Sequence, residues 1–229
     1  MDLELSEWEE SYKRGENFIF YPKEEVVKFI NRYVVKRKNI DEFIPILTNQ
    51  LPIKGLDLGC GIGRNTISLE EFGILAYGID ISKEAIETAK KLAIKLGFYE
   101  LTNRLSTYDS TNIPFPDNFF DIVIAESVLD SMFFNVAKKL IKEMDRVTSH
   151  YAFISLISGD CDKYDPEFSK DVVVEEQHEK GTIQSYYNYT KICELINDTN
   201  FKFKEIRKIT EEGINFKYKN ARYFIVLEK

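Results

Sequence analysis

Histidine and cysteine are scarce in this sequence, which has two histidines and three cysteines among its 229 residues. Cys60, Cys161 and Cys193 lie far apart, so they form neither a CxxC pair nor the dense pattern of a disulfide-stabilised secreted domain. Structural zinc sites take most of their ligands from cysteine and histidine. The sequence therefore predicts no metal site and no disulfide framework.

Acidic residues outnumber basic ones, 38 to 31. The formal net charge is −7 at pH 7, whereas contacts to nucleic-acid phosphates require clustered lysines and arginines. The one basic run, Lys36-Arg37-Lys38, is expected to close a helix and to lie in solvent, where it complements the helix dipole. The charge balance therefore disfavours a nucleic-acid partner.

Long apolar runs are missing as well. No stretch approaches the roughly 20 consecutive apolar residues that span a bilayer as a helix. The N-terminal MDLELSEWEE lacks the basic and apolar regions of a signal peptide. With 44% hydrophobic and 30% charged residues, the composition predicts a globular, cytoplasmic protein without a membrane span.

Segments typical of strands and helices alternate from residue 54 onward. Short apolar runs predict strands, and the stretches between them have the spacing of amphipathic helices. Such alternation implies right-handed crossovers and a mainly parallel sheet with both faces covered. We expect strands near residues 54–59, 74–80, 105–109, 119–126 and 151–157, and helices near 64–72, 82–97 and 136–147.

The chain is expected to be a single domain with additions on both sides of this core. The last two strands, FKFKEIRKI and ARYFIVLEK, are close enough in sequence to pair as an antiparallel hairpin. The predicted fold is α/β and doubly wound, with a mainly parallel seven-stranded sheet. Its expected parts are an N-terminal helical cap (1–40), a core (53–157), a lid-like insertion after the fifth strand (158–189), and a final helix and strand pair (190–229).

The segment GLDLGCGIGRN places Gly59, Gly61 and Gly63 directly after a predicted strand. Glycine allows unusual backbone dihedrals and lets a ligand touch the main chain, although a tight turn without a ligand is the alternative. Asp80 ends the next strand and Asp109 follows the third. Because the carboxyl ends of parallel strands share one edge of the sheet, these features together predict a site for a nucleoside-bearing cofactor.

The spacing of the glycines excludes two common nucleotide motifs. A dinucleotide fingerprint, GxGxxG, would require a third glycine at the position of Arg64. A P-loop would require GK[ST], which does not follow. The pattern is instead DxGxGxG, with Asp57 inside the strand, where an acid can meet a cationic ligand.

Three segments, LDLGCGIGRNTISL, AYGIDIS and YDSTNIPFPDNFFDIVIAESVLD, resemble the class I S-adenosylmethionine-dependent methyltransferases, and most closely their small-molecule branch. The resemblance covers residues 53 to about 157 and extends to the final antiparallel hairpin. It implies S-adenosylmethionine as cofactor and S-adenosylhomocysteine as product. The cofactor-binding residues that it implies are Asp57, Gly59, Cys60, Gly61, Gly63, Arg64 and Asn65 near the amino-acid portion, Asp80 and Ile81 near the ribose and adenine, Tyr108, Asp109 and Ser110 near the adenine, Glu126 and Ser127 near the methionyl end, and Tyr12 and Tyr21 from the N-terminal segment.

The sequence identifies the methyl acceptor less well than the methyl donor. Because the sulfonium already activates the methyl group, a general base is needed only if the acceptor carries a proton. Candidates for that role are Glu126, Asp130 and His178, the last of which also fits an exposed surface histidine. The sequence AESVLD stands where adenine and glutamine methyltransferases carry [DN]PP[YF], so those acceptors are disfavoured.

The sequence thus predicts O- or N-methylation of a small polar molecule, such as a sugar or a cell-envelope precursor, and leaves the oligomeric state open. Three alternatives remain at this point: a protein or RNA methyltransferase, a non-catalytic cofactor-binding protein, and an NAD-dependent oxidoreductase. The last of these usually carries a Tyr-x-x-x-Lys pair, and Tyr12, Tyr33 and Tyr108 have no lysine four residues on.

Overall fold

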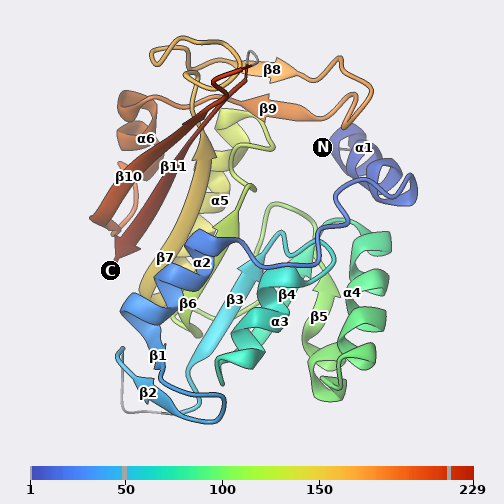
Figure 1. Ribbon diagram of the computed structural model, residues 1–229, viewed down its shortest axis with the longest axis vertical. Coiled ribbons are helices and arrows are strands. Elements are labelled where there is room, and N and C mark those ends of the chain that lie inside the picture. Colours follow the sequence, from blue (N-terminus) through green and yellow to red (C-terminus); the bar gives the residue numbers. More distant parts are fainter. Residues whose placement is uncertain (1, 48–50, 216–217) are drawn as a thin grey trace.

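The computed structural model describes residues 2–47, 51–215 and 218–229. A seven-stranded sheet runs through the centre of the molecule in the order β10-β11-β7-β6-β3-β4-β5 (Figure 1). Strands β3 to β7 of this sheet are parallel, and β11 is antiparallel to both of its neighbours. This confirms the predicted sheet and C-terminal hairpin. The strands are β3 (Lys54–Leu58), β4 (Leu75–Asp80), β5 (Leu105–Thr107), β6 (Phe120–Glu126), β7 (Thr148–Ile157), β10 (Lys202–Glu212) and β11 (Lys219–Glu228).

Helices cover both faces of this sheet because side chains alternate between the faces along each strand. Along β6, Val123 and Ala125 join one buried cluster, whereas Ile122 and Ile124 join the other. The first cluster includes residues of α5 and α6, and the second includes residues of α2, α3 and α4. These helices are α2 (Glu24–Phe29), α3 (Arg64–Glu71), α4 (Lys83–Lys95), α5 (Phe134–Val147) and α6 (Tyr189–Ile196).

The direction of the chain across the sheet reverses at β3. From β3 the chain proceeds outward to β4 and β5, and then returns to β6 on the opposite side of β3. The loops that follow β3 and β6 therefore leave the same edge in opposite directions. In open α/β sheets such a point creates a crevice at the carboxyl ends of the strands. The glycine segment is the first of these two loops.

The N-terminal segment forms α1 (Asp2–Lys13), α2 and a π-helical turn over Ile30–Val34. The prediction that Lys36-Arg37-Lys38 closes a helix was wrong, because β1 (Val35–Arg37) is a strand paired antiparallel with β2 (Phe43–Pro45). Its first residue, Val35, is buried, and β-branched side chains favour extended backbone. Arg37 and Lys38 remain exposed, as expected.

The insertion after β7 contains a hairpin, made of β8 (Asp171–Val173) and β9 (Ile183–Ser185). Lys191 of α6 fastens it to the domain, because its buried ammonium donates to the Asp171 carboxylate at 2.9 Å and to the Ser185 hydroxyl at 3.0 Å. Figure 1 shows the hairpin turn next to α1. The N–H of Glu179 in that turn donates to the carboxylate of Glu16 just after α1. Within the described ranges, no helix combines the length and the apolar character needed to cross a membrane.

Candidate functional site

The glycine loop folds back against the end of β4. The N–H groups of Gly59 and Cys60 both donate to the carbonyl of Ile79, at 2.8 and 3.0 Å. The N–H of Gly61 donates to one oxygen of Asp80 at 2.8 Å, and the N–H of Ser82 donates to the other at 2.9 Å. Asp80 thereby joins the glycine loop to the start of α4, and its buried carboxylate marks the floor of the crevice.

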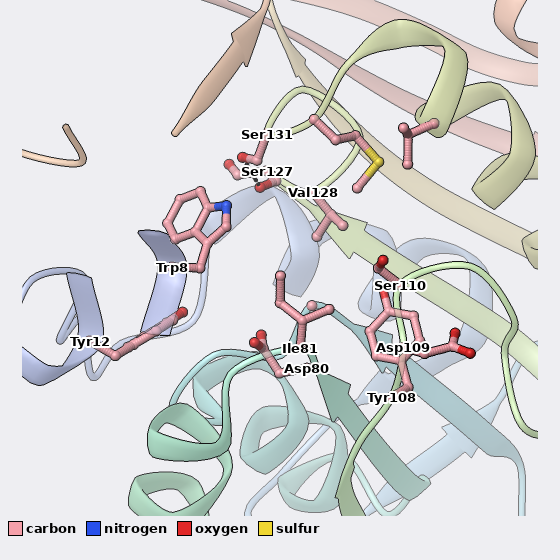
Figure 2. A pocket seen from close by; sticks show the side chains of 13 residues that line it. Trp8, Tyr12, Asp80, Ile81, Tyr108, Asp109, Ser110, Ser127, Val128 and Ser131 are labelled. Atoms are coloured by element: carbon pink, nitrogen blue, oxygen red, sulfur yellow. Dashed lines mark hydrogen bonds between the residues drawn. The ribbon is translucent and has the colours of Figure 1, made fainter. Parts of the chain in front are cut away.

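An apolar cavity opens beside Asp80 (Figure 2). In the figure, Trp8 from α1 lies across the cavity from Ile81, and Tyr108 and Ser110 lie on the loop after β5. Its walls combine flat aromatic rings and aliphatic side chains with a single buried carboxylate. The apolar cavity is lined mainly by Trp8, Ile81, Tyr108, Val128, Met132 and Val136, together with Asp80.

A second cavity, the polar chamber, adjoins the first. Both cavities share Trp8, Tyr12, Gly59, Ser127 and Ser131 in their lining, so they are two parts of one cleft. The chamber extends over the glycine loop toward β11 and the β8–β9 hairpin. Its charged side chains are Lys23, Arg64, Glu126, Asp130, Glu179 and Arg222.

Two ion pairs organise the charge in this chamber. Arg64 donates to the Glu126 carboxylate at 2.6 Å, and Arg222 donates to the Asp130 carboxylate at 2.6 Å. Burial opposes ionisation of Glu126, but Arg64 and Arg222 outweigh it and hold the pKa of Glu126 below its ordinary value. For Asp130 burial prevails, so its pKa is raised despite the adjacent guanidinium. The two carboxylates thus have pKa values shifted in opposite directions.

Comparison with known proteins relates the core that carries this cleft to a known family. Residues 56–155 match the family described as a methyltransferase domain, a range that contains the glycine loop, Asp80 and the end of β6. Residues 56–155 are thus similar to a methyltransferase domain, and the chain has the fold of S-adenosylmethionine-dependent methyltransferases of known structure.

The relatives of this chain differ in how much of it they match. An uncharacterized methyltransferase, YcgJ, of Bacillus subtilis (strain 168) is 29% identical over 112 residues, which are 49% of this chain and 41% of that protein. The chain covers 38% to 41% of the length of the curated relatives it matches.

Solved structures extend the match beyond the core. An S-adenosylmethionine-dependent methyltransferase from Methanosarcina mazei superposes with a TM-score of 0.64 at 22% identity, over 79% of this chain and 93% of that one. Magnesium protoporphyrin IX methyltransferase (ChlM) from Synechocystis PCC 6803, with bound SAH, has a TM-score of 0.55 at 18% identity, over 76% of this chain and 73% of that one. At these identities the likeness establishes the fold.

Most of the residues that the sequence predicts at a cofactor site line the cleft. In the apolar cavity and the polar chamber together lie Tyr12, Gly59, Cys60, Gly61, Arg64, Asn65, Asp80, Ile81, Tyr108, Asp109, Ser110, Glu126 and Ser127. Gly63 ends the loop as the N-cap of α3. Of the candidate bases, Glu126 and Asp130 face the chamber.

The structure places four expected residues outside the lining of both cavities: Gly63, Asp57, Tyr21 and His178. Asp57 lies beneath the glycine loop, where its buried carboxylate accepts the Thr66 hydroxyl at 2.6 Å. Tyr21 is 83% exposed on the segment before α2. The His178 side chain is 63% exposed at the hairpin turn, 3.7 Å from the Glu179 carboxylate. Asp109 lines the apolar cavity, but one of its oxygens accepts three hydrogen bonds from Thr111 and Asn112 in its own loop.

The sequence analysis missed Arg222 of β11, whose side chain lines the polar chamber. Arg222 lies 92 residues after Asp130, its partner in the chamber, and no motif points to it. One signal was available, because Arg222 interrupts the apolar run of ARYFIVLEK. Trp8 of α1, to which no motif points either, lines both halves of the cleft.

Replacing Gly59 by alanine is expected to destabilise the protein by about 2–4 kcal/mol, because it adds a steric clash to backbone strain. Gly59 has φ +66°, and a Cβ there would lie 2.5 Å from Cγ2 of Val128. Urea unfolding measures the loss. Gly73→Ala is the matched control, because Gly73 has φ +72° but no atom within 4 Å of the added Cβ. Equal losses in the two variants would show that close packing on Val128 plays no part.

Proposed function

We propose that this protein transfers a methyl group from S-adenosylmethionine to a small polar methyl acceptor and releases S-adenosylhomocysteine. The observation that carries the proposal is the two-part cleft at the carboxyl ends of β3, β4 and β6. Its apolar half suits an adenine ring, its polar half suits an amino acid and a polar molecule, and the two halves meet at Gly59 and Ser127. The family match supports the reaction class.

Within this proposal each part of the cofactor has a complementary surface. The adenine would lie between Ile81 and Tyr108, and the Asp80 carboxylate would accept hydrogen bonds from the ribose hydroxyls. The methionyl portion would pass along the glycine loop, where the Tyr12 hydroxyl lies 2.6 Å from the position that a Cβ on Gly61 would take. The bound SAH in the magnesium protoporphyrin IX methyltransferase structure supports assigning the same cofactor to this fold.

The chemical step requires the protein to position two molecules more than to activate either of them. The sulfonium supplies an activated methyl group when the cofactor is bound, so alignment and exclusion of water carry much of the rate. Glu126 and Asp130 lie in the chamber, whereas His178 is exposed outside it. A proton leaving the methyl acceptor would therefore pass to a carboxylate rather than to an imidazole.

The size of the methyl acceptor follows from what covers the chamber. Trp8 and Tyr12 of α1 form one wall, and Thr182, Ile183 and Gln184 of the hairpin form another. We infer that α1 and the insertion act together as a lid, which the hydrogen bond between Glu179 and Glu16 supports. A chamber closed in this way favours a metabolite-sized molecule over a folded protein or an RNA.

Calorimetric titration with S-adenosylmethionine, S-adenosylhomocysteine and NAD⁺ tests the donor, and transfer of a tritium-labelled methyl group tests the reaction. The labelled cofactor would be incubated with a fractionated metabolite extract, a peptide pool and total RNA. We expect micromolar binding of the two sulfur compounds and label in the small-molecule fraction. Binding of NAD⁺ alone, or label confined to peptide or RNA, would contradict the proposal.

A further inference from the structure

In both ion pairs of the polar chamber the carboxylate is more deeply buried than the guanidinium group. The side chains of Glu126 and Asp130 are only 3% and 4% exposed, whereas those of Arg64 and Arg222 are 20% and 16% exposed. A ligand in the chamber therefore meets the arginines before it meets their counter-charges. At these two ion pairs the chamber presents guanidinium groups, and its remaining charged side chains, Lys23 and Glu179, have opposite signs.

Arg222 keeps much of its hydrogen-bonding capacity unused. Its Nη2 donates to the Asp130 carboxylate at 2.6 Å and to the Ser127 hydroxyl at 2.8 Å. Its Nε is buried without a hydrogen-bond partner among the described residues, as is Oδ1 of Asp130. A guanidinium has five donors in a rigid fork that matches carboxylate and phosphate groups. An unpaired buried donor is costly unless a ligand or another group satisfies it.

The two arginines are placed for different ligands. Arg64 begins α3 directly after the glycine loop, beside the path proposed for the methionyl portion of the cofactor. Arg222 extends from β11 and contacts Ser127, at the point where the two cavities meet. Since Arg64 suffices for the cofactor's carboxylate, Arg222 remains for the second molecule. The cofactor's sulfonium would add a further positive charge to the chamber.

We propose that Arg222 binds an anionic group, a carboxylate or a phosphate, of the methyl acceptor, so that the acceptor is a small anion. This inference rests on the proposed methyl transfer and specifies its substrate class. Asp130 acts as a positioning residue, because its carboxylate holds the guanidinium through Nη2. Asp130 also weakens the attraction of Arg222 for anions by partly neutralising it.

The test uses the full chain saturated with S-adenosylhomocysteine and three small probes: malonate, inorganic phosphate and the neutral malonamide. Trp8 is the only tryptophan and lines both cavities, so its fluorescence reports binding in the cleft. We expect malonate or phosphate to bind and malonamide not to bind. Tighter binding of malonate would indicate a carboxylate-bearing acceptor, and tighter binding of phosphate a phosphate-bearing one.

Substitutions on the two sides of the ion pair are expected to act in opposite directions. Arg222→Gln should weaken anion binding by at least about tenfold, because it removes a charge-assisted hydrogen bond. Asp130→Asn should strengthen it by about three- to tenfold, because the guanidinium loses its counter-charge. Arg37 is exposed on β1, at the opposite end of the molecule, so Arg37→Gln should leave the affinity for anions unchanged. If Arg222→Gln fails to fold, the double variant with Asp130→Asn restores neutrality and should still lose anion binding.

Several outcomes would overturn this inference while leaving the proposed function intact. Anion binding that persists in Arg222→Gln, or that falls equally in Arg222→Gln and Asp130→Asn, would make the pair purely structural. Equal binding of malonate and malonamide would mean that the chamber does not select for charge. Failure of the wild-type protein to bind S-adenosylhomocysteine would instead refute the proposed methyl transfer, and this inference with it.

Discussion

Asp80→Ala is expected to reduce the affinity for S-adenosylhomocysteine by about a hundredfold or more, because it removes two hydrogen bonds to a charged group at once. The buried carboxylate of Asp80 lines the apolar cavity together with Ile81. It also accepts the N–H groups of Gly61 and Ser82, so the variant releases the glycine loop from α4. Calorimetric titration of the cofactor product measures the change.

Asp121→Ala separates the binding effect from general destabilisation. Asp121 also accepts a backbone N–H of the central sheet, that of Lys54 at 2.8 Å, but at the opposite end of β3. It should lower stability while leaving affinity within about twofold of the wild type, since its loss costs one hydrogen bond outside the cleft. Comparable losses of affinity in both variants would remove Asp80 from the proposed ribose site.

Periodicity was sufficient to predict the sheet and its helices, because each core element buries a regular stripe of side chains. In β6 the residues from Ile122 to Ala125 alternate between the two buried clusters. In α4 the buried Ala85, Ala89 and Ala93 recur at helical spacing after the Ser82 cap, whose hydroxyl accepts the Ala85 N–H at 3.1 Å. Such local signals do not depend on distant parts of the chain.

The parts that could not be predicted depend on contacts between distant residues. β1 exists because residues 35–37 pair with 43–45, and the helical stripe before it gave no sign of that partner. Arg222 enters the site only because β11 lies next to β7, which brings it to Asp130, 92 residues earlier. Asp57 fits the motif of the family, but whether its side chain points to a ligand or beneath the loop depends on Thr66.

Asp57 should also make the stability of the cofactor-free protein fall as pH rises. Burial raises its pKa from an ordinary value of 3.8 to about 7, even though the Thr66 hydroxyl lowers it. Between these values the unfolded chain has released this proton and the folded chain still holds it. The folded state is therefore disfavoured progressively from about pH 4 to about pH 7, by up to about 4 kcal/mol once both states are ionised.

Asp57→Asn isolates this contribution, because the amide oxygen can still accept from Thr66 but carries no charge. Urea unfolding between pH 5 and 9 should show the variant gaining stability relative to the wild type as pH rises to about 7, and a constant difference above it. Thr66→Val should act in the opposite sense: without the hydroxyl the pKa rises further, and the wild-type decline extends to higher pH. A difference between Asp57→Asn and the wild type that does not change with pH would mean that Asp57 is ionised throughout this range. The charge of Arg64, which also lowers the pKa of Asp57, would then outweigh burial beneath the glycine loop.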